Sequence, residues 1–316
     1  MNLAIQTTRL TKAYEVGFVG RKTVRALTDL DLTVEPGQLV GLLGPNGAGK
    51  STTIKLLLNL IRPSSGEVKL FGRPPADALA RAKVGFLPEN PAPYEYLTGR
   101  EFVTLAGQLA GMQGKALTQS VGQVIERVGM DRAKDLQIRK YSKGMIQRIS
   151  LAQSLVSTPD LLILDEPTSG LDVLGRQLVR DIIIEQRKRG TTVLFCSHII
   201  PDVEALCDRV VVLIGGKLVR DGKVTELLAG DDDQSELVIE GLEPGKLAAV
   251  PNVTQVEELG LRLSARVPDK HTTEALSAIF ALGGRVVSLN RSRFSLEALF
   301  LEALKTSANS VGSDIS

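Results

Sequence analysis

The sequence predicts an α/β fold built on a parallel sheet, and two observations lead to that prediction. Short runs of consecutive apolar residues have the continuous hydrophobicity of strands that are covered on both faces. Stretches of helical length and composition alternate with these runs, which is the rhythm of βαβ units. The predicted strands lie at residues 39–43, 161–164, 192–195 and 210–214.

The helices expected around this sheet follow from length and apolar spacing. One spans 51–60, directly after a glycine-rich loop, and another spans 170–189. Two further helices, at 98–112 and 115–128, succeed each other without a strand between them. Because this interrupts the βαβ alternation, we predict a helical insertion at about 90–157.

A linker is predicted at 230–234, where a glycine precedes three consecutive aspartates. The formal net charge is +7 over residues 1–230 and −5 over residues 231–316, so the sign of the charge changes at the same point. We therefore predict one domain at 5–230 and a small α+β domain at 231–316. In the second domain we expect strands at 235–239, 261–267 and 285–289 and helices at 271–282 and 295–304.

Composition excludes several classes of protein. The chain has 316 residues, no tryptophan, 4% aromatic residues and a net charge of +2, which gives little material for coating or stacking on nucleic acid. No run of 18 apolar residues is present to span a membrane, and the first ten residues lack a signal-peptide pattern. Cys196 and Cys207 lie in or beside apolar runs, and we expect buried, reduced thiols.

A phosphate-binding loop is the strongest motif in the chain. Residues 44–51 fit the pattern G-x-x-x-x-G-K-[ST], between a predicted strand and a predicted helix. Such a loop presents backbone N–H groups to phosphate oxygens, while its lysine reaches the β- and γ-phosphates and its final hydroxyl binds Mg²⁺. The residues expected to bind nucleotide here are Gly44, Pro45, Asn46, Gly47, Ala48, Gly49, Lys50, Ser51 and Thr52.

Two carboxylates end the predicted strand 161–164. Ligands gather at the carboxyl ends of strands in open parallel sheets, so Asp165 and Glu166 are placed to act together with the phosphate loop. Asp165 is expected to hold Mg²⁺, mostly through water, and Glu166 to polarise an attacking water molecule as general base. Without the loop, the same pair would more often be a surface turn.

The order of the motifs resembles that of the nucleotide-binding subunits of ABC transporters, over about residues 5–225. Besides the phosphate loop and the Asp165–Glu166 strand, Tyr141–Met145 resembles the family's signature motif. Ser169–Asp172 resembles its D-loop, and His198, which follows a predicted strand, resembles its switch histidine.

The resemblance implies a RecA-like P-loop core with an antiparallel β patch, which binds ATP and Mg²⁺ and hydrolyses ATP. It implies a homodimer in which two chains enclose two ATP molecules. Ser142, Gly144 and Asp172 of one chain then lie near the nucleotide of the other, while His198 contacts the γ-phosphate. The resemblance further implies a permease on a separate chain at the cytoplasmic side of the membrane, which docks near residues 89–96. Export is the favoured direction, and no nucleic-acid partner is expected.

Four positions depart from the family pattern or leave alternatives. Glu89 stands where the family has glutamine, and it is either a ligand on the Mg²⁺ side or a solvated loop charge. Lys143 and Met145 replace residues of the usual signature, and Met145 cannot make the hydrogen bonds of a glutamine. Tyr14 resembles the aromatic residue that stacks on adenine, although a packing role accounts for it equally.

The sequence lacks features that other classes of function require. An ABC-type ATPase acting on DNA or the ribosome would need a coiled coil, a zinc module or a second cassette, and the chain has no heptad tract and no C-x-x-C. A GTPase would need N-K-x-D, which is also missing. The apolar spacing near the C-terminus is typical of a packed face and less often of a binding face; it comprises Leu296, Leu299, Phe300 and Leu304.

Overall fold

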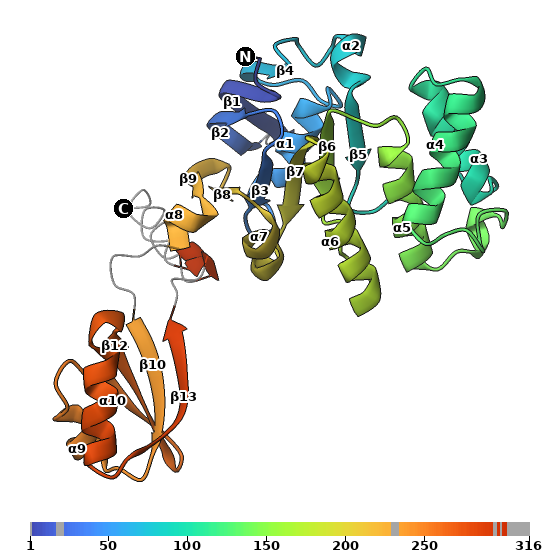
Figure 1. The fold of residues 1–316 in the computed structure, drawn as a ribbon. Coiled ribbons are helices and arrows are strands. Elements are labelled where there is room, and N and C mark those ends of the chain that lie inside the picture. The colour runs from blue at the N-terminus through green and yellow to red at the C-terminus, as the bar shows by residue number, and fades with distance from the viewer. Residues whose placement is uncertain (1, 17–21, 229–233, 293–295, 298, 302–316) are drawn as a thin grey trace. The chain divides into compact units, whose positions relative to one another are not determined.

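The computed structural model describes residues 2–16, 22–228, 234–292, 296–297 and 299–301. These residues form two compact units, one within 1–223 and one within 224–305 (Figure 1). The domain limits 5–230 and 231–316 stay a prediction. No helix in the described part of the chain is both long and apolar enough to cross a membrane.

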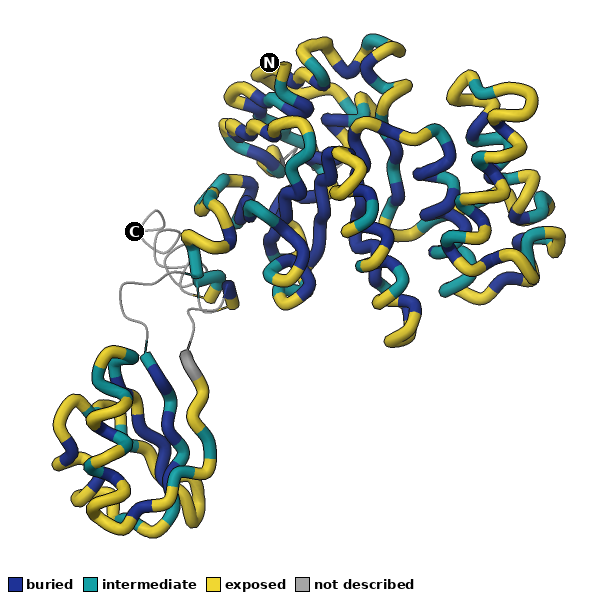
Figure 2. Tube along the Cα trace, in the orientation of Figure 1, coloured by how far each residue is buried: buried dark blue, intermediate teal, exposed yellow. Residues whose placement is uncertain are grey.

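A six-stranded sheet forms the centre of the first unit, in the order β5-β6-β7-β3-β8-β9. All neighbours are parallel except the last pair. The strands β3, β6 and β7 are buried along their whole length, as the dark blue of Figure 2 shows, which is why they read as unbroken apolar runs. The α/β prediction is confirmed. The strands are β3 (Leu39–Leu43), β5 (Val84–Leu87), β6 (Leu161–Asp165), β7 (Thr192–Ser197), β8 (Arg209–Ile214) and β9 (Lys217–Lys223).

A separate antiparallel sheet in the order β2-β1-β4 completes the core, as the sequence reading expected. Its strands are β1 (Ile5–Val16), β2 (Lys22–Val34) and β4 (Ser65–Leu70). Their inward-facing leucines join a single hydrophobic cluster with side chains of α1 (Lys50–Leu57) and of the central sheet. This shared core places the start of α1 beside β2. A short helix, α2 (Ala78–Arg81), precedes β5.

Two helices follow strands whose ends carry predicted site residues. The helix α6 (Val173–Lys188) follows β6, and α7 (Ile200–Leu206) follows β7. The sequence predicted that the first of these begins at 170. It begins at 173 because the Asp172 side chain accepts a hydrogen bond from the Gly175 backbone N–H at 2.8 Å and caps the helix.

The helical insertion contains α3 (Gly99–Leu109), α4 (Gly114–Arg127), η1 (Ile138–Lys140) and α5 (Lys143–Leu155). These helices gather beside the edge strand β5 (Figure 1). A capping box of Thr98 and Glu101 starts α3, since each side chain accepts a hydrogen bond from the other residue's backbone N–H. The predicted pair of consecutive helices is therefore present; α3 is four residues shorter than expected, and α4 has the expected length, shifted by one residue.

The second unit has a four-stranded antiparallel sheet in the order β11-β12-β10-β13, with a β-α-β-β-α-β chain order. Its elements are α8 (Val224–Leu228), β10 (Gln234–Glu240), α9 (Pro244–Ala248), β11 (Thr254–Leu259), β12 (Arg262–Pro268), η2 (Asp269–His271), α10 (Thr272–Ala281) and β13 (Arg285–Ser292).

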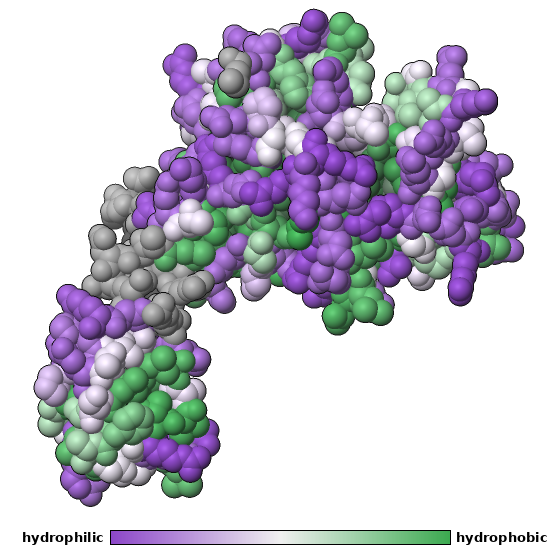
Figure 3. Space-filling view, viewed as in Figure 1, coloured by the Kyte–Doolittle hydropathy of each residue, from purple (hydrophilic) through white to green (hydrophobic). Residues whose placement is uncertain are grey.

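One strand of this unit was not predicted, and one predicted helix is described only in part. The strand β11 was not predicted, because it lies at an edge of the sheet and its side chains are mostly exposed and polar. Of the predicted helix 295–304, residues 296–297 and 299–301 are described and are helical, and the other positions lie outside the described residues. Figure 3 shows hydrophobic surface on this unit; its exposed apolar residues include Phe280, Leu282 and Leu289.

Candidate functional site

The phosphate loop connects β3 to α1 and has a tightly constrained backbone. Gly49 has a φ of 105°, and a Cβ atom there would lie 2.7 Å from the carbonyl oxygen of Ala26 on β2. A Cβ on Gly44 would lie 2.5 Å from the Leu213 carbonyl oxygen. Only glycine fits at these positions. As the N-cap, Gly49 supplies no side-chain acceptor, so the first N–H groups of α1 remain available to an anion.

The loop forms one wall of a cavity of 410 Å³ at the carboxyl ends of the parallel strands. The opposite walls come from the segments after β5, β6 and β7, which are far apart in sequence. Gly44 does not line the cavity, but its carbonyl oxygen accepts a hydrogen bond from Lys50, which does. The lining residues are Ala26, Pro45, Asn46, Gly47, Ala48, Gly49, Lys50, Ser51, Thr52, Glu89, Asp165, Glu166 and His198. Sequence reasoning missed Ala26, a small residue on β2 for which the motif carries no signal.

Lys50 is buried, and its ammonium group folds back over its own loop. Its Nζ donates to the carbonyl oxygens of Gly44 at 2.6 Å and Pro45 at 3.3 Å. These two contacts hold a positive charge at the edge of the cavity. Phosphate oxygens are stronger acceptors for an ammonium than neutral carbonyl groups are, because the bond is then between opposite charges.

Asp165 lies in a negatively charged environment. Burial raises the pKa of its carboxyl group to about 6, and the nearby carboxylates of Glu89 and Glu166 add to the rise. The Lys50 charge and a hydrogen bond with Ser51 oppose the rise without cancelling it. The cavity therefore gathers three carboxylates around one ammonium group, and an added cation would be stabilised there.

The donor set fits a hard divalent cation. A hydroxyl group and carboxylates offer the oxygen ligands that Mg²⁺ prefers. Within the described residues, no group of three or more His, Cys, Asp or Glu side chains could hold a metal ion. Such a site suits Mg²⁺ held by one or two protein groups together with substrate phosphates and water. The residues available for this are Ser51, Asp165 and Glu89.

Glu166 and His198 are in direct contact. The Nδ1 atom of His198 lies 2.8 Å from Oε1 of Glu166, and the Ser197 hydroxyl donates to Oε2 at 3.4 Å. The Glu166 backbone has a φ of 48°, which is uncommon for a residue with a side chain, while the carboxylate itself is buried. The sequence placed both residues near one phosphate; that they touch each other is seen only in the structure.

The signature residues and the D-loop aspartate do not line this cavity. Ser142 is exposed and caps α5, accepting from the Met145 backbone N–H at 3.3 Å. Gly144 faces Leu171, since a Cβ there would lie 3.5 Å from that side chain. Asp172 caps α6, and the Arg148 guanidinium lies 3.7 Å from its carboxylate. The structure thus brings these three residues near one another and away from the chain's own phosphate loop.

Tyr14 also lies outside the residues that line the cavity. It sits on β1 opposite Val24, partly buried, and the Nζ of Lys12 lies 5.0 Å from the centre of its ring. That spacing is a cation–π contact. The role of Tyr14 against adenine stays a prediction.

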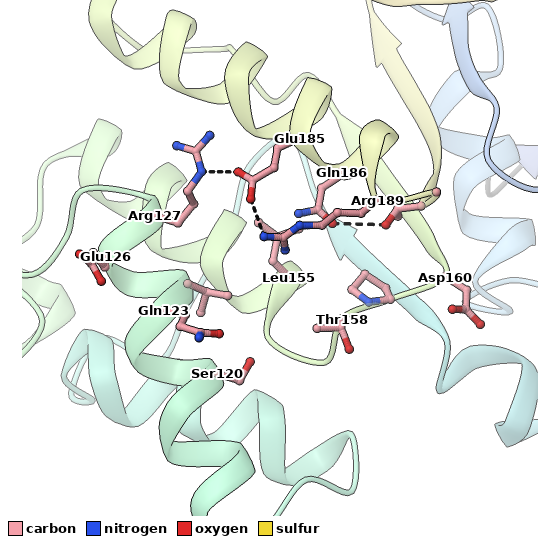
Figure 4. A pocket seen from close by; sticks show the side chains of 14 residues that line it. Ser120, Gln123, Glu126, Arg127, Leu155, Thr158, Asp160, Glu185, Gln186 and Arg189 are labelled. Carbon is pink, nitrogen blue, oxygen red and sulfur yellow. Dashed lines mark hydrogen bonds and ion pairs between the residues drawn. The ribbon is translucent and has the colours of Figure 1, made fainter.

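A larger cavity of 660 Å³ lies at the amino ends of β6 and β7, between α4 and α6 (Figure 4). Glu185 projects into it and pairs with Arg127 at 2.5 Å and with Arg189 at 2.5 Å (Figure 4). None of the residues predicted to bind nucleotide lines it. Both arginines of the lining are paired with Glu185, so neither is available to an anion, and we assign no ligand to this cavity.

The chain is similar to ATP-binding proteins of ABC transporters. The family model described as "ABC transporter" matches residues 27–169. An uncharacterized ABC transporter ATP-binding protein of Nostoc sp. is 40% identical over 311 residues, covering 95% of this chain and 90% of that relative. The daunorubicin/doxorubicin resistance ATP-binding protein DrrA of Streptomyces peucetius is 34% identical, covering 94% of this chain and 91% of that protein.

Solved structures share the fold of the first unit. A structure described as the ATP-binding subunit of an ABC transporter has a TM-score of 0.64 and 29% identity, covering 71% of this chain and 91% of that chain. A dimeric bacterial ABC transporter cassette also has a TM-score of 0.64, at 24% identity. The neighbours cover about seven tenths of this chain, which is close to the size of the first unit.

Proposed function

The chain belongs to the ABC transporter family as an ATP-binding subunit, an ATPase that powers a separate permease, and from this premise we propose that it hydrolyses MgATP at the phosphate-loop cavity to drive export. One observation supports the site assignment above all others. Lys50, Ser51, Asp165, Glu166 and His198 come from three separate regions of the sequence and line one cavity of 410 Å³.

In the proposed mechanism, the loop and Lys50 bind the phosphates. The available N–H groups at the start of α1 bind phosphate oxygens, and the Lys50 ammonium exchanges its carbonyl partners for phosphate oxygens. Ser51, Asp165 and Glu89 would hold Mg²⁺, which would supply positive charge to neutralise the phosphates. The loop and lysine orient the γ-phosphate for attack.

Glu166 acts as general base in this mechanism. Its carboxylate accepts a proton from a water molecule as that water attacks the γ-phosphate in line with the leaving oxygen. His198 and Ser197 hold the two carboxylate oxygens at 2.8 Å and 3.4 Å, so the base is oriented before substrate arrives. His198 is exposed toward solvent, which leaves its ring accessible to a γ-phosphate.

A second copy of the chain completes each site in our proposal. Ser142 and Gly144 begin α5 and Asp172 begins α6, at surface positions that do not reach the cavity of their own chain. A head-to-tail homodimer would place them against the nucleotide bound to the other copy. The start of α5 then offers N–H groups and the Ser142 hydroxyl to that γ-phosphate.

Export and location follow from the relatives and remain proposals. DrrA is named for drug resistance, a Bacillus subtilis relative is named a linearmycin resistance ATP-binding protein, and a Cupriavidus metallidurans relative is named a Nod factor export ATP-binding protein. We propose export by the same arrangement, with the chain at the cytoplasmic face of the membrane. Tyr94 and Tyr96, exposed to 69% and 76% after β5, suit a docking surface for the permease.

The test of the site is Lys50→Ala, with Lys55→Ala as the matched control. Both lysines belong to α1, but Lys55 is exposed and does not line the cavity. Loss of the Lys50 charge should lower ATPase turnover by about a hundredfold, because the γ-phosphate loses its cation. The Lys55 variant should hydrolyse ATP at the normal rate. Equal turnover in the two variants would refute the assignment of residues 44–51 as the phosphate-binding loop.

A further inference from the structure

Asp202 is a buried carboxylate outside the nucleotide cavity, on the first turn of α7. Its side chain is 1% exposed. Oδ2 accepts a hydrogen bond from the Thr168 hydroxyl at 3.2 Å, and Oδ1 pairs with the Arg180 guanidinium of α6. Thr168 is fully buried, so its hydroxyl has no access to water. A buried charge in such a place is costly unless both oxygens are held, as they are here.

The partners of Asp202 connect two segments that carry the proposed chemistry. Thr168 follows Glu166 by two residues and precedes Asp172 by four, while Asp202 follows His198 by four. The Thr168–Asp202 bond and the Glu166–His198 contact therefore tie the same two stretches of chain at two separate points. Two separate contacts fix the orientation of a segment, whereas a segment held at one point can still rotate about that point.

The same segment is held from a third side by α5. Gln147 is 2% exposed, and its Nε2 donates to the carbonyl oxygen of Pro167 at 3.2 Å. Pro167 and Thr168 are consecutive, so the peptide between Glu166 and Asp172 is fixed by the signature helix on one side and by α7 on the other. The Gln147–Pro167 and Thr168–Asp202 hydrogen bonds are both buried.

The ion pair between Asp202 and Arg180 leaves one polar atom of the arginine without a hydrogen bond. The Arg180 Nε is buried and has no hydrogen-bond partner within the described residues. Buried ion pairs often contribute little net stability, because the cost of removing charges from water offsets their attraction. The network is better explained by the position that it gives to Thr168.

We propose that Asp202 is a positioning residue for ATP hydrolysis, which holds Thr168 and so sets Glu166 against His198 and Asp172 toward the second copy. This inference rests on the roles proposed above for Glu166 and His198. Asp202 does not touch the nucleotide. Its contribution is to orient a general base, for which a misplacement of about 1 Å can cost on the order of a hundredfold in rate.

The chain offers a matched control at the far end of α7. Asp208 also pairs with an arginine of α6, Arg187, and it accepts from the Leu39 backbone N–H at 3.2 Å. It does not bond to the segment between Glu166 and Asp172. Asp202→Asn and Asp208→Asn remove the same charge, from a carboxylate that pairs with the same helix. Only the first of them loosens the Thr168 contact.

The experiment measures steady-state ATP hydrolysis and MgATP binding by the purified full-length chain. Thr168→Val keeps the side-chain shape and removes the hydroxyl, and Thr168→Ser restores the hydroxyl. We expect kcat to fall about tenfold to a hundredfold in Asp202→Asn and in Thr168→Val, with KM and MgATP affinity within about twofold of normal. Thr168→Ser and Asp208→Asn should keep normal kcat. The double variant Asp202→Asn, Thr168→Val should be no slower than the slower single variant.

Three results would overturn the inference. These are normal kcat in folded Asp202→Asn or Thr168→Val, a Thr168→Ser variant as slow as Thr168→Val, or losses in the double variant that multiply. If Asp202→Asn does not fold, the two Thr168 variants decide the question. Glu166→Gln separates this inference from the proposed function: if Glu166→Gln hydrolyses ATP normally, the base assignment fails, whereas its inactivity beside a fully active Thr168→Val refutes only the role of Asp202.

Discussion

Acidification should weaken Mg²⁺-dependent ATP binding through Asp165. The perturbation is a decrease in pH from 7.5 to 5, across the pKa of about 6 that burial, Glu89 and Glu166 give this carboxyl group. A proton on Asp165 removes the charge that would face Mg²⁺. Binding therefore competes with protonation, and affinity falls once the pH is below the pKa.

The magnitude follows from the fraction of Asp165 that is ionised. With a pKa of about 6, the carboxyl group is almost fully ionised at pH 7.5 and about one-tenth ionised at pH 5. Affinity for MgATP should therefore fall about tenfold, or about 1.4 kcal/mol. In the chain without nucleotide, acidification has the opposite effect on the stability of the fold: protonation of Asp165 stabilises it. The pKa of Asp165 in the folded chain lies above the ordinary aspartate value of 3.8, so the stability from Asp165 is complete below about pH 4 and is lost as pH rises through 6.

The assay is calorimetric or fluorescence binding of MgATP at pH 5, 6 and 7.5 to the normal chain and to Asp165→Asn. Protonation of ATP itself lowers the affinity of both proteins equally. The effect of Asp165 is therefore the loss of affinity in the normal chain minus the loss in Asp165→Asn, and we expect this difference to be about tenfold. Glu89→Gln is a second control. Removing its charge should lower the Asp165 pKa and move the loss of affinity to lower pH. An identical pH dependence in the normal chain and in Asp165→Asn would refute the reasoning.

Two other predictions concern the assembled transporter. Glu166→Gln should lose hydrolysis while keeping MgATP affinity, and light scattering should show it as a monomer alone and as a dimer with MgATP, because ligand that binds only the dimer shifts association by mass action. Adding Ser142→Arg should abolish that dimer; a dimer that persists, or a Glu166→Gln chain that stays monomeric with MgATP, would contradict the shared site. Glu89→Gln should keep basal hydrolysis and alter its stimulation by the permease, and equal stimulation of both proteins would make Glu89 an ordinary loop charge.

Several features were predicted from the sequence because they depend on local properties of the chain. The strands β3, β6 and β7 are buried on both faces, so apolar residues run through them and polar residues stand only at their ends. The loop from Gly44 to Ser51 is identifiable because its glycines meet strict backbone requirements. By contrast, β11 is an exposed edge strand of mostly polar residues, and no local pattern distinguishes it from a loop.

The sequence by itself determined which residues carry the chemistry, since Lys50, Asp165 and Glu166 belong to motifs with fixed spacing. Only the tertiary structure decided how those motifs meet. His198 reaches Glu166 across 32 positions, and Thr168 reaches Asp202 across 34. These contacts arise because β6 and β7 are adjacent parallel strands whose carboxyl ends lie at the same edge. Strand adjacency depends on how the whole sheet packs, so neither contact can be inferred from the residues near it in the sequence.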